Sequence, residues 1–186
     1  MTLTPVPFTY LRHGETEWNR LGQAQGVTDI PLNEVGRAQA EAARPLIHAE
    51  PPKIIAVSPL LRARETAEIV NRGLDLPMVE IHDLRECGFG AMEGEPMGPW
   101  FHEWLKGERI IPRAEPAHQF LARALKGINE ALALPGPVLI VAHGGVYRSI
   151  RMAAKFTDNG PIPNAHPIKL HPPADGYAWR SSFTGQ

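Results

Sequence analysis

The sequence predicts an α/β fold with three layers, in which a mainly parallel sheet carries helices on both faces and a small lid is inserted. Two observations lead to this prediction. Short apolar runs typical of buried strands alternate along the chain with longer segments whose apolar residues recur at helical spacing. In addition, no internal repeat or linker-like stretch interrupts the 186 residues, so we expect a single domain over residues 1–186.

The first strand and helix of this pattern are readable near the amino end. Residues 6–11 (VPFTYL) form an apolar run that predicts a buried strand. Residues 33–50 predict a helix, because Asn33 suits an N-cap and the apolar residues after it lie at helical spacing. Pro45 is expected to bend or shorten the last turn of that helix.

The next unit repeats the order of strand, helix and strand. Residues 53–58 (KIIAVS) predict the second strand. A helix is expected over residues 59–73, with Pro59 in its first turn and Gly73 at its carboxyl end. Residues 77–82 (PMVEIH) predict a short third strand.

The second half of the chain supplies a long helix, a strand and another helix. The long helix is expected over residues 116–134. Residues 138–142 form the most apolar strand of the chain, and a further helix is expected over residues 146–156. Because strands and helices alternate throughout, the sheet is expected to be covered on both faces.

Two segments lie outside this alternation. Residues 91–116, which contain MGPWFHEWLKG with two of the four Trp residues, fit no sheet pattern and are expected to form a small lid. The tail is rich in proline and contains two strand-like pieces, residues 166–171 and 176–183. These pieces fit either edge strands or an ordered tail.

Composition and charge exclude several classes of function. The chain has 19 basic and 20 acidic residues and a net charge of -1, so we expect no nucleic-acid or membrane-surface partner. A lone cysteine, Cys87, excludes an intramolecular disulfide and the usual cysteine-based zinc sites. The amino end lacks the pattern of a signal peptide, and no stretch reads as a transmembrane helix. We therefore expect a cytoplasmic protein, while its oligomeric state stays open.

Three motifs follow strands of the predicted sheet. RHGE follows the first strand, SPLLRARETA the second, and AHGG the most apolar one. Ligands of open α/β sheets bind outside the carboxyl ends of the strands, where helix N-termini also favour anions. Glycines such as Gly14, Gly144 and Gly145 are expected to let the backbone approach a ligand closely. The residues expected to converge there are Arg12, His13, Arg62 and His143.

Two arginines and two histidines at one crevice indicate phosphoryl chemistry. Arginine matches the oxygens of a phosphate, and a neutral histidine can attack phosphorus. Transfer also needs a proton for the leaving oxygen, which a carboxylic acid in a partly dry site can supply. The segment LRECGFGAMEG offers Glu86 for this role, with Glu93 as the second choice.

Five motifs together resemble those of one family. RHGETEWN, QGVTDIPLNEVGRAQA, SPLLRARETA, LRECGFGAMEG and VAHGGVYR follow one another from Phe8 to Arg151. In this order and spacing they are similar to the motifs of the histidine phosphatase superfamily, in its phosphoglycerate-mutase-like branch. The resemblance implies a phosphoglycerate-mutase-like fold and an enzyme that uses no metal and no cofactor, with a small phosphorylated molecule as substrate.

The resemblance also implies a role for each matching residue. His13 is expected to be the nucleophile that becomes phosphohistidine, and Glu86 to protonate the leaving group and then activate water. The transferred phosphoryl group is expected to be bound by Arg12, Arg62 and His143. The remaining residues expected to line the pocket are Asn19, Gln25 at the substrate mouth and Gly144 through its backbone N–H. Asn164 is given a structural role only.

Several alternatives stay open at this point. The segment between Glu86 and His143 is shorter than the resemblance implies for true mutases, which favours a phosphomonoester hydrolase over a phosphoglycerate mutase. A non-catalytic module that binds phosphate or protein on the same fold is the alternative of another class. The complete set of motif residues argues against it. The aromatic lid residues Trp100, Phe101 and Trp104 fit either substrate contact or packing.

Overall fold

The computed structural model describes residues 2–158, 160–174 and 178–184. Within these residues the strands form a single six-stranded sheet in the order β3-β2-β4-β1-β5-β6. The strands are β1 (Phe8–Arg12), β2 (Ile54–Val57), β3 (Met78–Glu80), β4 (Val138–Ala142), β5 (Ile168–His171) and β6 (Arg180–Phe183). The first four run parallel, whereas β5 pairs antiparallel with β1 and β6 antiparallel with β5. The predicted α/β class with a mainly parallel sheet is therefore confirmed.

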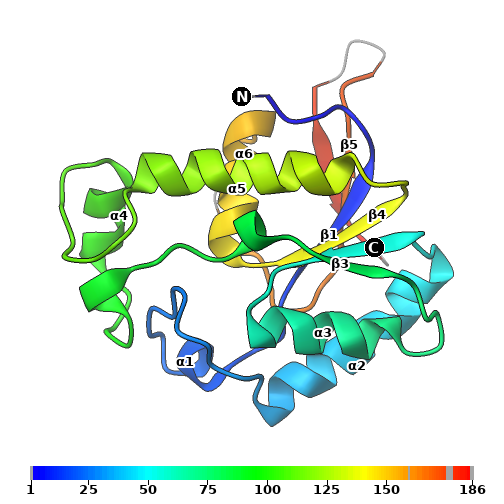
Figure 1. The fold of residues 1–186 in the computed structure, drawn as a ribbon, viewed down its shortest axis with the longest axis horizontal. Helices are drawn as coiled ribbons and strands as arrows, with labels where there is room; N and C mark the ends of the chain where they lie inside the picture. Colours follow the sequence, from blue (N-terminus) through cyan, green and yellow to red (C-terminus); the bar gives the residue numbers. More distant parts are fainter. Residues whose placement is uncertain (1, 159, 175–177, 185–186) are drawn as a thin grey trace.

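Helices cover both faces of the sheet (Figure 1). The helices are α1 (Glu17–Arg20), α2 (Glu34–Ala49), α3 (Leu61–Asn71), α4 (Pro99–Leu105), α5 (Ala117–Leu132) and α6 (Gly144–Ala154), with short 3-10 turns η1 (His82–Leu84) and η2 (Gly90–Met92). On one face α2 and α3 bury apolar residues such as Ile47 and Val70 against Leu11 and Val141 of the sheet. On the other, Ile128 of α5 and Ile150 of α6 pack against the strands. The result is the three-layer arrangement that the sequence predicts.

The elements differ in detail from those expected. Helix α2 begins after its N-cap Asn33, as predicted, but Pro45 does not end it. The helix continues to Ala49, and Pro45 lies on its exposed side. Ala43 and Ile47 on the opposite face remain buried against the sheet.

The tail forms two strands rather than an ordered coil. Strand β5 lies inside the sheet, between β1 and β6, and β6 forms the edge with all its residues exposed. Residues 176 and 177 of the expected last strand lie outside the described residues. Strand β4 covers the residues expected. It was easier to predict than the tail, because a strand buried along its whole length appears in the sequence as a continuous apolar run.

The register of β1 and β4 brings two distant motifs together. Arg12 lies opposite Ala142, and the backbone N–H of His13 donates to the Ala142 carbonyl at 3.0 Å. The residues that follow the two strands, His13 and His143, therefore emerge side by side. Their ring centroids are 5.2 Å apart.

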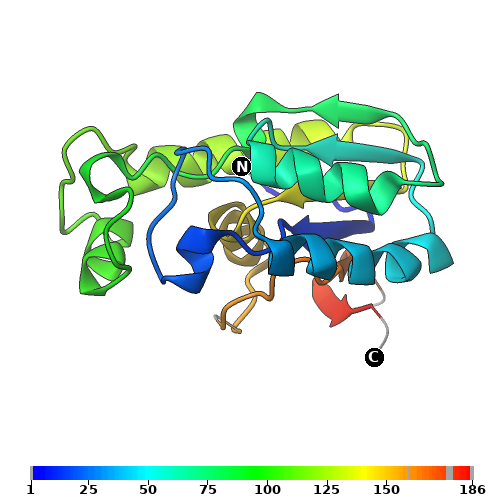
Figure 2. The same cartoon turned by 90° about the horizontal axis from the view of Figure 1, so that it is seen from below.

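The lid segment extends beyond this end of the sheet. Figures 1 and 2 place α4 and α1 at the same end of the molecule. Four aromatic rings hold α4: Phe89 contacts Trp100, Phe101 and Trp104 edge-to-face, with centroids 5.4–6.0 Å apart. Trp100 and Trp104 are buried, and their indole N–H groups donate to the carbonyls of Pro96 and Glu115. These two residues pack the lid onto the domain.

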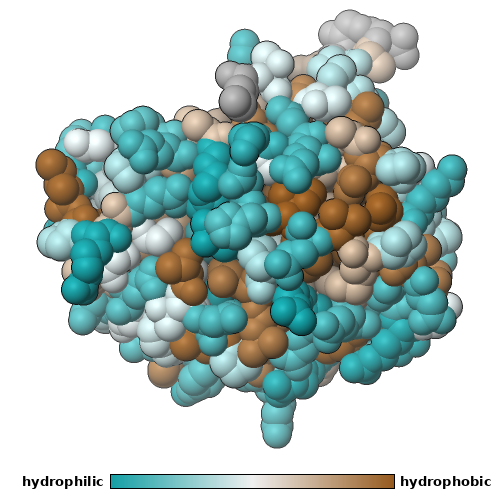
Figure 3. Space-filling model, viewed as in Figure 1, coloured by the Kyte–Doolittle hydropathy of each residue, from teal (hydrophilic) through white to brown (hydrophobic). Residues whose placement is uncertain are grey.

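The opposite end of the sheet, away from the motif residues, carries a hollow of about 520 Å³. It is lined by Phe8 and Val138, the first residues of β1 and β4, and by Leu132 and Leu134. In Figure 3 a patch of apolar side chains is visible on this side of the molecule, with smaller apolar areas elsewhere in the same view. This hollow is thus separated from the motif residues by the length of the strands.

Candidate active site

A cavity of about 390 Å³ opens at the carboxyl ends of β1 and β4. It lies where strand-to-helix turns of an α/β sheet usually bind ligands. Of the predicted site residues, seven line this cavity: Arg12, His13, Asn19, Gln25, Arg62, Glu86 and Gly144. The eighth, His143, is fully buried beside His13. The structure therefore brings together all the residues expected to converge.

His13 is held as a neutral ring with one nitrogen free. Its Nδ1 lies 2.7 Å from the Gly14 carbonyl. Because a carbonyl only accepts, Nδ1 must carry the proton, which leaves a lone pair on Nε2. Burial lowers the pKa of His13 well below 6.5, and the nearby Arg62 and Arg12 cations lower it further. The ring is thus neutral at ordinary pH.

Arg62 is the most buried cation of the site. It is 1% exposed and sits in the first turns of α3, where its Nη1 and Nη2 donate to the carbonyls of Thr28 and Gly26 at 3.0 and 2.8 Å. Burial lowers the pKa of its guanidinium to about 10, so it remains charged at neutral pH. Its Nε is buried without a partner among the described residues.

Arg12 is fixed in a similar way. Its Nη1 donates to the Ile162 carbonyl at 2.8 Å, which ties β1 to the loop before β5. Its Nε, like that of Arg62, is buried without a partner in the described part of the chain. Two guanidinium groups held by backbone carbonyls and left with free N–H groups form a site suited to an anion with several oxygens.

His143 completes the anion site from the start of α6. Its Nε2 lies 2.7 Å from the Ser58 hydroxyl at the end of β2, while the buried Nδ1 has no partner within the described ranges. Tyr10 of β1 holds the backbone of His143 in place, because its hydroxyl donates to the His143 carbonyl at 2.6 Å. Burial and the neighbouring Arg62 lower the pKa of His143 well below 6.5.

Glu86 lies in the segment after β3 and lines the same cavity as His13 and Arg62. Its Oε2 accepts from the Gly145 N–H at 2.9 Å and its Oε1 from the Cys87 N–H at 3.0 Å. A Cβ at Gly145 would lie 2.2 Å from Oε1, so only glycine permits this approach. Gly144, the first residue of α6, lines the cavity with a backbone N–H that helix geometry leaves without an intrahelical partner.

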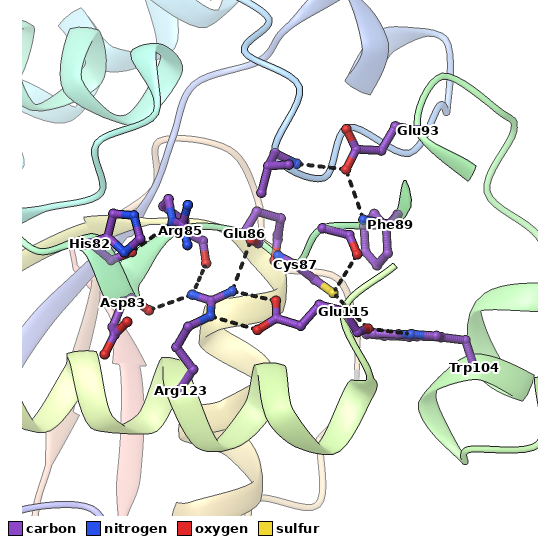
Figure 4. Close-up of polar contacts among 12 residues, drawn as sticks. His82, Asp83, Arg85, Glu86, Cys87, Phe89, Glu93, Trp104, Glu115 and Arg123 are labelled. Carbon is purple, nitrogen blue, oxygen red and sulfur yellow. Dashed lines mark hydrogen bonds and ion pairs between the residues drawn. The ribbon is translucent and has the colours of Figure 1, made fainter. Parts of the chain in front are cut away.

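Arg123 of α5 fixes the backbone on which Glu86 sits (Figure 4). Its guanidinium donates to the carbonyls of Asp83, Arg85 and Glu86 at 3.0–3.3 Å. The same group forms a bidentate pair with Glu115, at 2.7 and 2.8 Å. One side chain therefore links the Glu86 segment to the base of the lid. This role was not predicted from the sequence, because the carbonyl partners of Arg123 lie 37–40 residues away along the chain.

Glu93, the second choice for the acid, does not line the cavity. Figure 4 shows its carboxylate turned toward backbone groups, and it accepts from the N–H groups of Val27, Thr28 and Phe89 at 2.9–3.1 Å. The Thr28 hydroxyl also donates to it. Glu93 therefore stabilises the loop whose carbonyls bind Arg62.

Asn19 and Gln25 line the cavity beside this loop. Thr16 is the N-cap of α1 and forms a capping box with Asn19, whose Oδ1 accepts from the Thr16 N–H at 3.2 Å. The amide nitrogen of Asn164 donates to the His13 carbonyl at 2.8 Å, which supports the structural role expected for Asn164. Gln25 is 7% exposed, and its Oε1 has no partner in the described residues.

Gly14 is required for packing rather than for ligand approach. A Cβ at this position would lie 2.4 Å from the Gly36 carbonyl oxygen in the first turn of α2. The two glycines let the turn after β1 contact the start of α2. The expectation that Gly14 brings backbone to a ligand is therefore corrected.

Cys87 is buried, and burial raises the pKa of its thiol.

Of the three aromatic lid residues, Phe101 lines the cavity, whereas Trp100 and Trp104 are buried and pack the lid. The cavity lining also includes residues that were not predicted from the sequence, among them Gln23, Met97, His102, Tyr147, Arg148 and Arg151. Arg148 and Arg151 follow Gly144 at spacings of four and seven, which places them on one helix face. This spacing could have identified Arg148 and Arg151 from the sequence, because the helix after the AHGG motif was expected to begin near the site.

The described residues offer neither a metal cluster nor a membrane-spanning helix. Among them, no group of three or more His, Cys, Asp or Glu side chains is placed to hold a metal ion. In the same part of the chain, no helix is long and apolar enough to cross a membrane.

Comparison with known proteins places this geometry in a family. Residues 8–174 match the histidine phosphatase superfamily, branch 1. The chain is 39% identical over 142 residues to the uncharacterized phosphatase PhoE of Bacillus subtilis strain 168, covering 75% of this chain and 72% of that protein. It is 33% identical over 146 residues to the probable phosphoglycerate mutase GpmB of Yersinia enterocolitica, covering 72% and 67%.

Solved structures give the same result. A mycobacterial glucosyl-3-phosphoglycerate phosphatase, solved with VO3, superposes with a TM-score of 0.80 at 26% identity, covering 95% of this chain and 97% of that one. A phosphoglycerate mutase from Thermus thermophilus gives 0.71 at 33% identity, covering 89% and 92%. The protein is thus similar to phosphatases and phosphoglycerate mutases of α/β fold. It belongs to the histidine phosphatase superfamily, branch 1.

Proposed function

We propose that the protein is a metal-independent phosphomonoester hydrolase that acts on a small phosphorylated metabolite through a phosphohistidine at His13. The observation that carries this proposal is the state of the His13 ring. Its Nδ1 is bound to the Gly14 carbonyl, so the Nε2 lone pair is free within a cavity that also contains Arg12 and Arg62. A neutral imidazole beside two fixed cations is a nucleophile matched to a phosphate ester.

In the first step, Nε2 of His13 forms a bond to phosphorus while the bond from phosphorus to the leaving oxygen breaks. The protonated carboxyl of Glu86 gives its proton to that oxygen, and the alcohol departs. The free N–H groups of Arg12 and Arg62 bind the equatorial oxygens, with His143 beside them. Their contribution is largest where charge spreads over these oxygens in the transition state.

In the second step, water attacks the phosphohistidine. The Glu86 carboxylate takes a proton from this water as the new oxygen–phosphorus bond forms. The bond from Nε2 to phosphorus breaks, inorganic phosphate is released and His13 returns to the neutral ring. Glu86 is thus the acid of the first step and the base of the second, and ends protonated as it began.

The open lid favours hydrolysis over return of the phosphoryl group to an organic acceptor. Met97 is 44% exposed and His102 is exposed, although both line the cavity. Water therefore reaches the site when the leaving group departs, whereas a sealed site would exclude it. A relative named as a phosphatase agrees with this choice.

Phosphoglycerate mutation is the second candidate, because other relatives carry that name. It requires that the phosphohistidine be protected from water until a phosphoglycerate takes the group. A mutase would convert 3-phosphoglycerate to 2-phosphoglycerate faster than it releases phosphate, and would depend on a bisphosphate primer. Measuring both products in one reaction separates the two candidates.

The test of the proposal is p-nitrophenyl phosphate hydrolysis by the wild type and by His13→Ala, with a chelator present. We expect nitrophenol release by the wild type and a decrease of at least about a thousandfold in His13→Ala. Retained activity in His13→Ala would exclude the nucleophile assignment, and loss of wild-type activity on chelation would exclude metal independence. Inactivity of the wild type on all esters, with no mutase activity, would favour a non-catalytic binding module.

A further inference from the structure

The ring of His143 has one nitrogen that is bound to the protein and one that is not. Its Nε2 lies 2.7 Å from the Ser58 hydroxyl, whereas its buried Nδ1 has no partner among the described residues. Burial and the Arg62 cation lower the pKa of His143 well below 6.5, so the ring is neutral at ordinary pH. A neutral imidazole carries a single N–H, on either Nδ1 or Nε2. The position of that proton decides whether Nδ1 donates or accepts.

The hydrogen bonds of Ser58 indicate which tautomer is present. Ser58 is fully buried, and its Oγ accepts from the Leu60 N–H at 3.3 Å. Within the described ranges, Nε2 of His143 is its one other hydrogen-bond partner. If Nε2 carried the proton, the hydroxyl would accept from two donors, and its own proton would be buried without an acceptor. If Nε2 is bare, the hydroxyl donates to it and every polar group of the serine is paired.

The same reasoning at Nδ1 points to an anion. With the proton on Nδ1, the ring holds a buried N–H that lacks a partner in the described part of the chain, and the Nε–H groups of Arg12 and Arg62 are in the same state. Both arginines lie within electrostatic reach of the His143 ring. The oxygens of one phosphoryl group would satisfy such a set of donors. A lone pair on Nδ1 would instead repel those oxygens.

The backbone of His143 is fixed independently of its ring. Its carbonyl accepts from the Tyr10 hydroxyl at 2.6 Å and from the Tyr147 N–H at 3.1 Å. Ser58 is itself held at the end of β2, because its N–H donates to the Val141 carbonyl of β4 at 3.0 Å. The Ser58 side chain can therefore control the proton on the ring without being needed to hold the residue in place.

We infer that Ser58 is a positioning residue that holds His143 as the Nδ1–H tautomer, so that Nδ1 donates a hydrogen bond to the transferred phosphoryl group. This inference rests on the proposed function and deepens it, since it assigns the Ser58 hydroxyl a role at the same site. Ser58 forms no covalent bond and transfers no proton in either step. The Nδ1–H adds a donor to oxygens on which negative charge grows in the transition state.

The tautomer of His143 can be measured in the wild type by nitrogen-15 NMR. Long-range correlation of the ring nitrogens with the carbon-bound ring protons distinguishes a protonated nitrogen from a bare one, and His143→Gln identifies the signals. Near neutral pH and without ligand, we expect a protonated Nδ1 and a bare Nε2. A proton on Nε2 would overturn the inference. This measurement does not depend on the folding of any Ser58 variant.

The decisive variant is Ser58→Ala, with Ser149→Ala as its matched control. Ser149 is 3% exposed, and its Oγ has no partner among the described residues, so it is a buried serine without a histidine contact. Ser58→Ala should place a proton on Nε2 in a measurable fraction of molecules and lower kcat/KM for p-nitrophenyl phosphate by about 10- to 100-fold. Ser149→Ala should keep the tautomer and stay within about threefold of the wild type.

The position of the proton separates a positioning role from a structural one. A structural loss in Ser58→Ala would lower activity and leave the proton on Nδ1, so an unchanged tautomer would overturn the inference whatever the rate. Ser58→Thr retains the hydroxyl and should retain the Nδ1–H tautomer.

Binding of inorganic phosphate separates this inference from the proposed function, because it requires no turnover. Calorimetric titration should show binding weakened by about 3- to 10-fold in Ser58→Ala and unchanged in Ser149→Ala. Equal binding by all three proteins would overturn the inference. An Nδ1–H tautomer and Ser58-dependent binding without hydrolysis of any ester would overturn the proposed function and support the inference. Hydrolysis by a wild type with the proton on Nε2 of His143 would do the reverse.

Discussion

The two ends of the cavity are built in different ways. At the phosphoryl end, Arg62 and His143 are 1% and 0% exposed, and their polar groups are fixed by backbone carbonyls and by Ser58. At the lid end, Met97 is 44% exposed, and the Arg148 side chain is held by contact with a ring. The first end is rigid and suited to a group that all substrates share. The second is more exposed, and we expect it to vary with the substrate.

Among substitutions that keep His13, the largest effect is expected from Arg62→Met, which removes a cation of the phosphoryl end while keeping much of its volume. Loss of its charge and donors should lower kcat/KM for p-nitrophenyl phosphate by about 100- to 1000-fold. Steady-state kinetics together with thermal unfolding measures this. A decrease of less than about tenfold in a folded variant would contradict the proposed difference between the two ends, because the phosphoryl end would then not bind the transferred group.

A smaller effect is expected from Arg123→Lys, because lysine cannot bind the Glu86 segment and Glu115 at once. We expect kcat to fall about tenfold and the free energy of unfolding to fall by about 1–3 kcal/mol, since several buried carbonyls lose their donor. Arg109→Lys is the control, because its ion pair with Glu103 is exposed on both sides. Equal results for the two variants would contradict a positioning role for Arg123.

The buried histidines predict a dependence of stability on pH. The folded-state pKa of His13 and His143 lies well below 6.5, so below about pH 6.5 the unfolded chain binds protons that the folded protein does not. The free energy of unfolding therefore falls as pH falls, by up to about 1.4 kcal/mol per pH unit for each histidine. Chemical denaturation between about pH 6.5 and 5 should show a smaller slope in His13→Gln. An identical slope would contradict the burial of a neutral ring.

The smallest effect is expected at the lid, from Met97→Ala. Because Met97 is 44% exposed, we expect kcat/KM for p-nitrophenyl phosphate to change by no more than about threefold. The free energy of unfolding should stay within about 0.5 kcal/mol of the wild type. A decrease comparable to that of Arg62→Met would show that the lid end takes part in the chemistry shared by all substrates.

The same contrast explains what could be predicted from the sequence. His13, Arg62 and His143 lie in motifs directly after strands or in the helix that follows one, so strand order and the carboxyl-end rule place them together. Arg148 and Phe101 are in contact although they belong to different helices, α6 and α4, and no local sequence pattern reports that contact. Arg123 was missed for the same reason, since its carbonyl partners belong to another segment.

Two local expectations changed for identifiable physical reasons. Pro45 was expected to bend or shorten the last turn of α2, but the helix continues to Ala49 with Pro45 on its exposed side, where water can replace the hydrogen bond that a proline lacks. Gly14 suggested a contact with a ligand, whereas its missing Cβ makes room for the backbone of Gly36. In both positions the residue type was informative, but the partner was set by packing between α2 and the sheet.

The most direct test of the account is to trap the phosphohistidine. Glu86→Gln should still react with p-nitrophenyl phosphate, because nitrophenolate leaves without a proton, but it cannot activate water. Rapid mixing followed by intact-mass and peptide analysis should then find one phosphoryl group on His13, at a higher occupancy than in the wild type. His13→Gln in the same experiment should carry none. A burst of nitrophenol from Glu86→Gln with no phosphoryl group on His13 would contradict the proposal that His13 is the nucleophile.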